Sequence, residues 1–254
     1  TALIEQVDWD CQVEKLYREN NLGCKQAVSQ AINWFFEKEE MGIILEDDCL
    51  PSPSFFLYCE KLLIKYKDDE NIFSINGCNL GYNGPSEASY SFTRFVNMWG
   101  WATWRRSARK VDYEMAEWKK NSNKYAFLRE RLKNEKLKSG EHKWYLHWLL
   151  LFNQINKIDT WDYQFTFTRL INSGLSIIPS RNLIENIGFT KEATHTQGVP
   201  ENICNTILRE PKFSGNEPIG FIPDVEFDQK VFENRVKSFG ASNSLLKRIV
   251  KKYV

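Results

Sequence analysis

The sequence predicts an α/β protein, a three-layer sandwich with a mainly parallel central sheet. Short apolar segments typical of buried strands alternate with longer segments of helical periodicity through the first part of the chain. The 254 residues suffice to bury a large core, and no internal repeat or low-complexity segment is present. We therefore expect one large domain or two small ones, with ligands bound at the carboxyl ends of the strands.

The elements of the first part are predicted in the order strand, helix, strand, helix, strand. They cover residues 11–17, 25–37, 42–45, 54–66 and 73–76. Both helices carry apolar residues at helical spacing; the first begins after the Gly23 turn, and the second has Pro53 near its first turn. Because helices connect the strands, we expect the strands to pair in parallel.

The later part is predicted to contain helices over residues 113–151, a helix that opens with Asp162, and a strand over 176–179. We divide the chain into a domain over residues 1–200 and a C-terminal extension over residues 201–254. The extension ends in a short basic amphipathic helix over residues 244–254. Two interpretations of that helix stay open: a final packing helix, or a peripheral contact with an anionic membrane surface.

Composition narrows the class of protein. The 34 basic and 33 acidic residues give a net charge of +1, which argues against nucleic-acid binding by bulk electrostatics. The six cysteines form no CxxC pair, so we interpret them as reduced thiols of a cytoplasmic protein. Because we find no signal peptide and no apolar run of spanning length, we expect a soluble protein that at most lies on the inner face of the plasma membrane.

The most informative motif is the acidic triplet Glu46-Asp47-Asp48, which directly follows the apolar strand over residues 42–45. Three adjacent carboxylates repel one another unless a cation or hydrogen-bond donors compensate their charge. A metal ion is the obvious compensating group, and a solvated turn after the strand is the alternative.

The triplet and its surroundings resemble the DxD-type motif of glycosyltransferases with the GT-A fold. Residues 46–56 are similar to the segment of N-acetylglucosaminyltransferase I-type enzymes in which an acidic triplet precedes a proline and a Phe-Phe pair. Further similarities follow in the family's order at residues 74–79, 99–101 and 161–162, and at 186–188 with His195. The resemblance covers roughly residues 11–198 and also suits bacterial glycosyltransferases related to family 2.

The resemblance implies a metal-dependent, inverting transfer of a sugar from a nucleotide-diphosphate donor to a hydroxyl acceptor. Asp48 is expected to bind Mn²⁺ or Mg²⁺, with His195 as a second candidate ligand, because a divalent ion neutralises the charge of the leaving diphosphate. Glu46 and Asp47 are expected to contact the ribose, the sugar hydroxyls or metal-bound water. Asp162 is the expected base, since a helix N-terminus favours a carboxylate.

Three further residues are candidates for donor binding. Arg18 and Lys25 are placed on the rim of the base pocket, and Trp101 belongs to a tryptophan-rich segment that either stacks on a sugar ring or packs in the core. Two other residues have structural alternatives. In the alternative interpretation, Asp162 only caps the N-terminus of its helix, and His195 has only a structural role in a loop.

The donor is expected to be a UDP-sugar, and the acceptor a glycan, a lipid-linked sugar or a protein, in bacterial surface-glycan assembly. The resemblance also implies that the family's first strand is absent from this chain. The main rival is therefore a catalytically silent sugar- or nucleotide-binding domain of the same fold. A phosphatase with a DxD motif needs Asp as its first acidic residue, where this chain has Glu46. A metal-dependent nuclease would need more clustered His and Asp residues.

Overall fold

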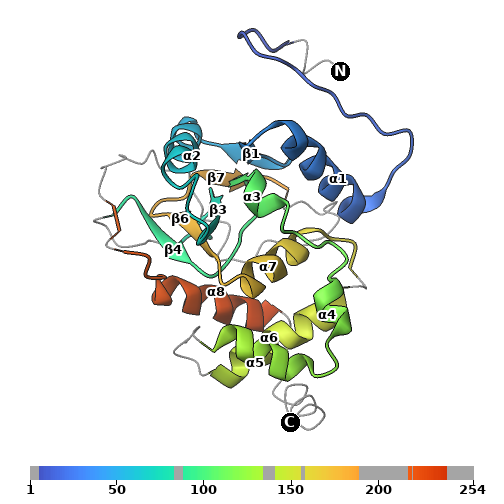
Figure 1. The fold of residues 1–254 in the computed structure, drawn as a ribbon. Coiled ribbons are helices and arrows are strands. Elements are labelled where there is room, and N and C mark those ends of the chain that lie inside the picture. Colours follow the sequence, from blue (N-terminus) through green and yellow to red (C-terminus); the bar gives the residue numbers. More distant parts are fainter. Residues whose placement is uncertain are drawn as a thin grey trace.

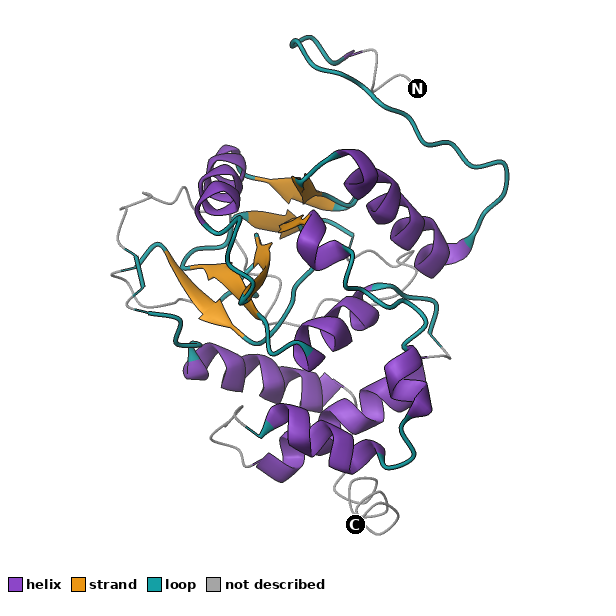
Figure 2. Ribbon diagram, in the orientation of Figure 1, coloured by secondary structure: helices purple, strands orange, loops and turns teal. Residues whose placement is uncertain are grey.

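The structure, a computed structural model, describes residues 6–82, 88–133, 141–155, 158–188, 217–218 and 220–238. Its centre is a five-stranded sheet with the order β1-β5-β3-β6-β4 (Figures 1 and 2). The five strands are β1 (Met41–Ile44), β3 (Ile72–Asn76), β4 (Tyr90–Thr93), β5 (Trp101–Trp104) and β6 (Leu175–Pro179). A two-stranded sheet of β2 (Cys49–Pro51) and β7 (Ile184–Asn186) lies beside it.

The protein has the predicted α/β class, but the prediction of a mainly parallel sheet is wrong. Among the described strands of the central sheet, only β3 and β6 form a parallel pair; β1 with β5, β3 with β5, and β4 with β6 are antiparallel. The reason is that β5 lies between β1 and β3 and runs against both. Strands β1 and β3 therefore point the same way, because each pairs antiparallel with β5.

The carboxyl ends of β1, β3 and β6 therefore meet at one edge of the sheet. Ile44 and Asn76 are both in register with Trp101, and β6 continues parallel to β3. At this edge the Gly77 N–H donates to the Gly100 carbonyl at 2.8 Å, and a Cβ on Gly77 would lie 2.7 Å from that oxygen. Glycine is therefore required for the close approach of these backbones.

Helices cover both faces of the sheet. On one face, α2 (Pro53–Lys65) packs Phe55, Tyr58 and Leu62 against strand residues such as Ile75. On the other face, α1 (Gly23–Lys38) and α7 (Asp162–Ile171) pack against Phe73 and Trp101. The predicted helices over 25–37 and 54–66, and the helix opening at Asp162, are confirmed, as are the strands over 42–45, 73–76 and 176–179.

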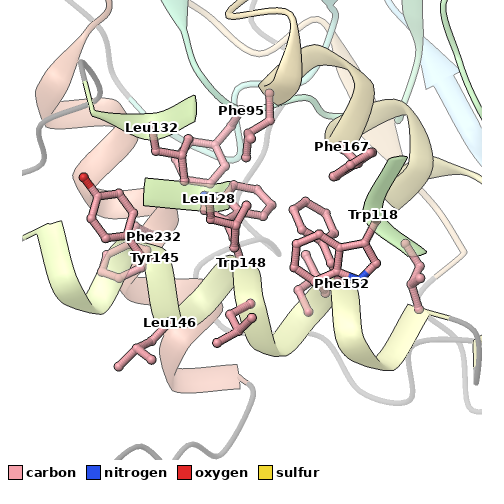
Figure 3. Packing of buried hydrophobic residues seen from close by; sticks show 14 of the residues in the cluster. Phe95, Trp118, Leu128, Leu132, Tyr145, Leu146, Trp148, Phe152, Phe167 and Phe232 are labelled. Carbon is pink, nitrogen blue, oxygen red and sulfur yellow. The ribbon is translucent and has the colours of Figure 1, made fainter. Parts of the chain in front are cut away.

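The remaining helices gather on one side of the molecule, at the bottom of Figure 1. They are α4 (Ala116–Lys120), α5 (Lys124–Leu132), α6 (Glu141–Gln154) and α8 (Val225–Ser238), while the short α3 (Arg105–Ala108) follows β5. Figure 3 shows the aromatic core of this layer, where Trp118, Trp148 and Phe152 lie close together. The prediction of helices over residues 113–151 is confirmed for the described part of that range.

Helix α8 shares that core through Phe227, Val231 and Phe232. The described part of residues 201–254 thus packs with residues of the preceding domain. A buried ion pair fixes it further, because Asp228 accepts from Arg94 Nη1 at 3.0 Å. The predicted domain boundary at residue 200 and the predicted tail helix over 244–254 lie outside the described residues.

The predicted strand over residues 11–17 is wrong. The segment is extended but pairs with no strand among the described residues, and it runs along the outside of the molecule before α1 (Figure 1). Trp9 and Tyr17 are 66% and 65% exposed. Among the residues that the structure describes, no helix has the length and apolar character needed to cross a bilayer.

Candidate functional site

The acidic triplet forms a tight turn at the carboxyl end of β1. The Cys49 N–H donates to the Glu46 carbonyl at 3.1 Å, which closes a four-residue turn between β1 and β2. Glu46 and Asp48 are half-buried, whereas Asp47 is exposed. The turn therefore places three carboxylates at the sheet edge where ligands bind in α/β proteins.

Asp48 is held from the other side by the segment that follows β7. Its backbone carbonyl accepts the Ile187 N–H at 2.8 Å, and its Oδ2 lies 3.3 Å from Asn186 Nδ2 as a hydrogen-bond acceptor. Gly188 lies directly against the carboxylate, since a Cβ at that position would be 2.9 Å from the Asp48 Cβ. The β2–β7 pairing thus orients the carboxylate that the sequence predicts as metal ligand.

Asp162 is the first residue of α7, and it reaches the same region from a distant part of the sequence. The Thr160 hydroxyl donates to its carboxylate. The preceding residue, Trp161, is buried and stacks on Trp101, with ring centroids 5.7 Å apart and an interplanar angle of 25°. This aromatic pair ties the start of α7 to β5.

Trp101 therefore packs in the core and is not a sugar-stacking platform, which corrects its predicted role in donor binding. Its side chain has no exposed area, and its ring is covered by Trp161 and Phe165. Trp101 packs on the face of the sheet that α1 and α7 cover, whereas Ala102 packs on the α2 face, because side chains alternate along a strand. Its role is to support Trp161, the neighbour of Asp162.

The electrostatics of Glu46 indicate that Asp162 lies near the acidic turn. Burial, and then the charges of Asp48, Asp162 and Asp47, raise the pKa of Glu46 to about 7. Part of this rise comes from the negative charge of the neighbouring carboxylates, which adds to the larger effect of burial. We call Glu46, Asp47, Asp48 and Asp162 the acidic cluster.

Sequence reasoning missed Asp159, which anchors this region to α1. Its carboxylate accepts the backbone N–H groups of Cys24 and Lys25 at 2.8 and 2.9 Å. These N–H groups belong to the first turn of α1, where helical partners are lacking and a negative charge is favoured. No local pattern around Asp159 signals a contact with a helix 134 residues away along the chain.

The carboxylate oxygens of the acidic cluster are suitable ligands for a hard divalent ion, but the cluster does not supply a complete set of protein ligands. Among the described residues, no three His, Cys, Asp or Glu side chains converge on a common metal position. Mg²⁺ is commonly held by one or two carboxylates together with substrate phosphates and water. A single ligand from Asp48, oriented by Asn186, fits that kind of site.

The other candidates have different positions. Lys25 lies in the first turn of α1, and its Nζ pairs with Glu114 at 2.8 Å. Arg18 is exposed in the extended segment before α1, without a hydrogen bond or ion pair to any described residue of the acidic cluster. His195 lies outside the described residues.

No protein-family model matches the chain, and no curated protein matches it in sequence. The resemblance to glycosyltransferases therefore rests on the motifs named above.

Proposed function

We propose that the protein is a metal-dependent, inverting glycosyltransferase of GT-A architecture. The observation that carries the proposal is the proximity of Asp162 to the acidic turn, expressed in its effect on the pKa of Glu46. The resemblance to glycosyltransferases singles out both features in the sequence, the acidic turn as the donor clamp and Asp162 as the base. Their common location at the carboxyl end of β1 supports a single reaction centre.

Asp48 would hold Mn²⁺ or Mg²⁺, which when bound stabilises the negative charge of a leaving diphosphate. Glu46 and Asp47 would contact the ribose, the sugar hydroxyls or metal-bound water. The elevated pKa of Glu46, caused by burial and neighbouring carboxylates, supports this assignment because bound cations relieve such repulsion.

Asp162 would accept the proton of the acceptor hydroxyl as that oxygen attacks the anomeric carbon. Attack occurs on the face opposite the diphosphate, so the configuration of the anomeric carbon inverts. The Thr160 hydroxyl and the Trp101–Trp161 stack orient Asp162 for this step. No separate general acid is required, since the diphosphate leaves with its charge compensated.

The donor would be a UDP-sugar, and the acceptor a glycan, a lipid-linked sugar or a protein of bacterial surface-glycan assembly. We place the reaction in the cytoplasm, where the protein is either free or bound peripherally to the inner face of the plasma membrane. The free thiols of Cys11, Cys24, Cys49, Cys59 and Cys78 support a reducing compartment.

A thermal-shift panel of nucleoside diphosphates and nucleotide sugars, with and without Mn²⁺, tests the proposal. A ligand that binds only the folded state raises the melting temperature. We expect at least one nucleotide to do so only with Mn²⁺, and the effect to disappear in Asp48→Asn. Absence of any nucleotide effect would count against the proposal.

Measuring the release of nucleoside diphosphate from the same nucleotide sugars separates the enzyme from a silent binding domain. A silent domain would bind a nucleotide or sugar but would release no nucleoside diphosphate from any donor. Binding that is independent of Mn²⁺ and unchanged in Asp48→Asn would favour that alternative.

A further inference from the structure

A second candidate site lies at the end of the sheet opposite the acidic cluster. It is a cavity of about 360 Å³ whose walls include Met41, the first residue of β1, and Trp104, the last residue of β5. Because β1 runs from the cavity to the acidic turn, the two sites are on the order of 15 Å apart. A ligand in the cavity would therefore not occupy the proposed donor site.

Positive charge is concentrated around this cavity. Four basic and two acidic side chains line it: Lys67, Arg105, Arg106 and Arg109, with Glu40 and Asp68. The whole chain, by comparison, has a net charge of only +1. The ion pair between Lys67 and Asp68 is exposed and 3.9 Å long, so it contributes little to neutralising the cavity.

Arg106 is fixed by the protein backbone. Its Nε, Nη1 and Nη2 donate to the carbonyl oxygens of Lys67, Ile72 and Tyr66, and its guanidinium carbon lies 4.3 Å from the centre of the Trp104 ring. These contacts hold the loop between α2 and β3. Arg106 therefore contributes a fixed positive charge to the cavity, while four of its five N–H donors already have partners, the fourth being the Ser107 hydroxyl.

Arg105 and Arg109 have donors to spare. Arg105 Nε donates to the carbonyl oxygens of Phe36 and Glu39 at 2.8 and 3.0 Å, which holds its side chain against the end of α1. Its two terminal nitrogens, and the whole guanidinium of Arg109, have no hydrogen-bond partner among the described residues. An anchored guanidinium loses less entropy when it binds an oxyanion.

We propose that this cavity, the basic pocket, binds a phosphate-bearing anion. Guanidinium groups match phosphate oxygens in geometry and charge, and Arg105 and Arg109 supply the free donors. Lys67 adds a mobile positive charge at the rim. The volume admits a phosphate monoester of a small molecule or the headgroup of an anionic lipid.

The test titrates inorganic phosphate into the full chain by calorimetry in the presence of a chelator, so that no metal site contributes. Arg109→Gln should weaken binding about tenfold, because one charge-assisted interaction is lost. Glu40→Gln should strengthen binding, since it removes a repelling carboxylate. Arg129→Gln, which removes an exposed arginine from α5, should leave binding unchanged.

Vesicles identify the source of the phosphate. The probe is sedimentation of the protein with vesicles of equal parts phosphatidylcholine and phosphatidic acid. If the protein sediments with the vesicles, Arg109→Gln weakens this binding and free phosphate does not bind, the phosphate belongs to a lipid headgroup. If free phosphate binds, the natural ligand is a soluble phosphate compound. Asp48→Asn should then bind free phosphate as tightly as the unmodified chain, because the acidic cluster is a separate site. The proposal is overturned if neither probe binds, or if Arg129→Gln weakens binding as much as Arg109→Gln.

Discussion

Gly188 lies so close to the Asp48 carboxylate that a side chain at position 188 has no room: a Cβ would overlap Oδ2 and lie 3.0 Å from Cγ. Gly188→Ala should therefore displace Asp48. Misplacement of a reacting group by about 1 Å reduces rates about 100-fold, so we expect a loss of that order in donor turnover.

Ile187→Ala is the matched control, because this neighbouring side chain is 55% exposed. It should retain donor turnover and the Mn²⁺-dependent thermal shift. Equal activity of Gly188→Ala and Ile187→Ala would show that the position of Asp48 does not matter for the reaction.

The assignment of Trp101 to the core predicts a large effect on stability. Trp101→Ala removes a fully buried ring that contacts Trp161 and Phe165, and such truncations cost about 3–5 kcal/mol. Urea denaturation should report this loss, with a smaller loss in Trp101→Phe. If both variants kept the original stability and lost only sugar binding, Trp101 would be a ligand platform after all.

Asp159 should act on both stability and turnover. Asp159→Ala leaves the N–H groups of Cys24 and Lys25 without their acceptor, which should cost about 1 kcal/mol. It should also lower turnover more than donor affinity, because the segment leading to Asp162 loses its anchor. Asp112→Ala is the control, since among the described residues the Asp112 carboxylate accepts N–H groups only from its near neighbours Glu114 and Ala116. It should reduce stability without changing turnover.

The buried ion pair between Arg94 and Asp228 predicts a dependence of stability on pH. Burial is the main cause that raises the pKa of Asp228 from 3.8 to about 6, against the opposing effects of Thr93 and Arg94. Between these values the folded state keeps a proton that the unfolded state releases. The free energy of unfolding should therefore fall as pH rises through that window.

Denaturant titrations across this pH range should show the slope in the original chain and its absence in Asp228→Asn. Arg94→Met, which leaves the buried carboxylate without its partner, should cost about 3 kcal/mol at neutral pH. An unchanged slope in Asp228→Asn would assign the pH dependence to other groups.

Local patterns in the sequence were sufficient for the elements that carry the site. The apolar run before Glu46 and the acidic start of α7 have local signatures, and both elements form where predicted. Local sequence could not predict whether the strands pair in parallel or antiparallel. The decisive strand, β5, pairs with strands far away in sequence, and nothing within Trp101–Trp104 specifies a partner. Residues 11–17 have no partner strand among the described residues, so the strand predicted from their local sequence does not form.

The candidate site, too, contains residues that the sequence predicts and residues that only the fold reveals. Asp48 and Asp162 stand out in the sequence as charges that need an explanation. Asp159, Trp161 and Asn186 act only through contacts with distant segments, and these contacts arise from the fold.

The proposed function requires the acidic cluster to cleave a nucleotide-sugar donor. The most direct measurement is release of nucleoside diphosphate from a panel of nucleotide sugars in the presence of Mn²⁺, compared among the original chain, Asp48→Asn and Asp162→Asn. We expect release from at least one donor, dependence on Mn²⁺, and a loss in both variants while their folded structure is retained. Release that is undiminished in both variants, or no release from any donor by the original chain with acceptor sugars present, would contradict the account.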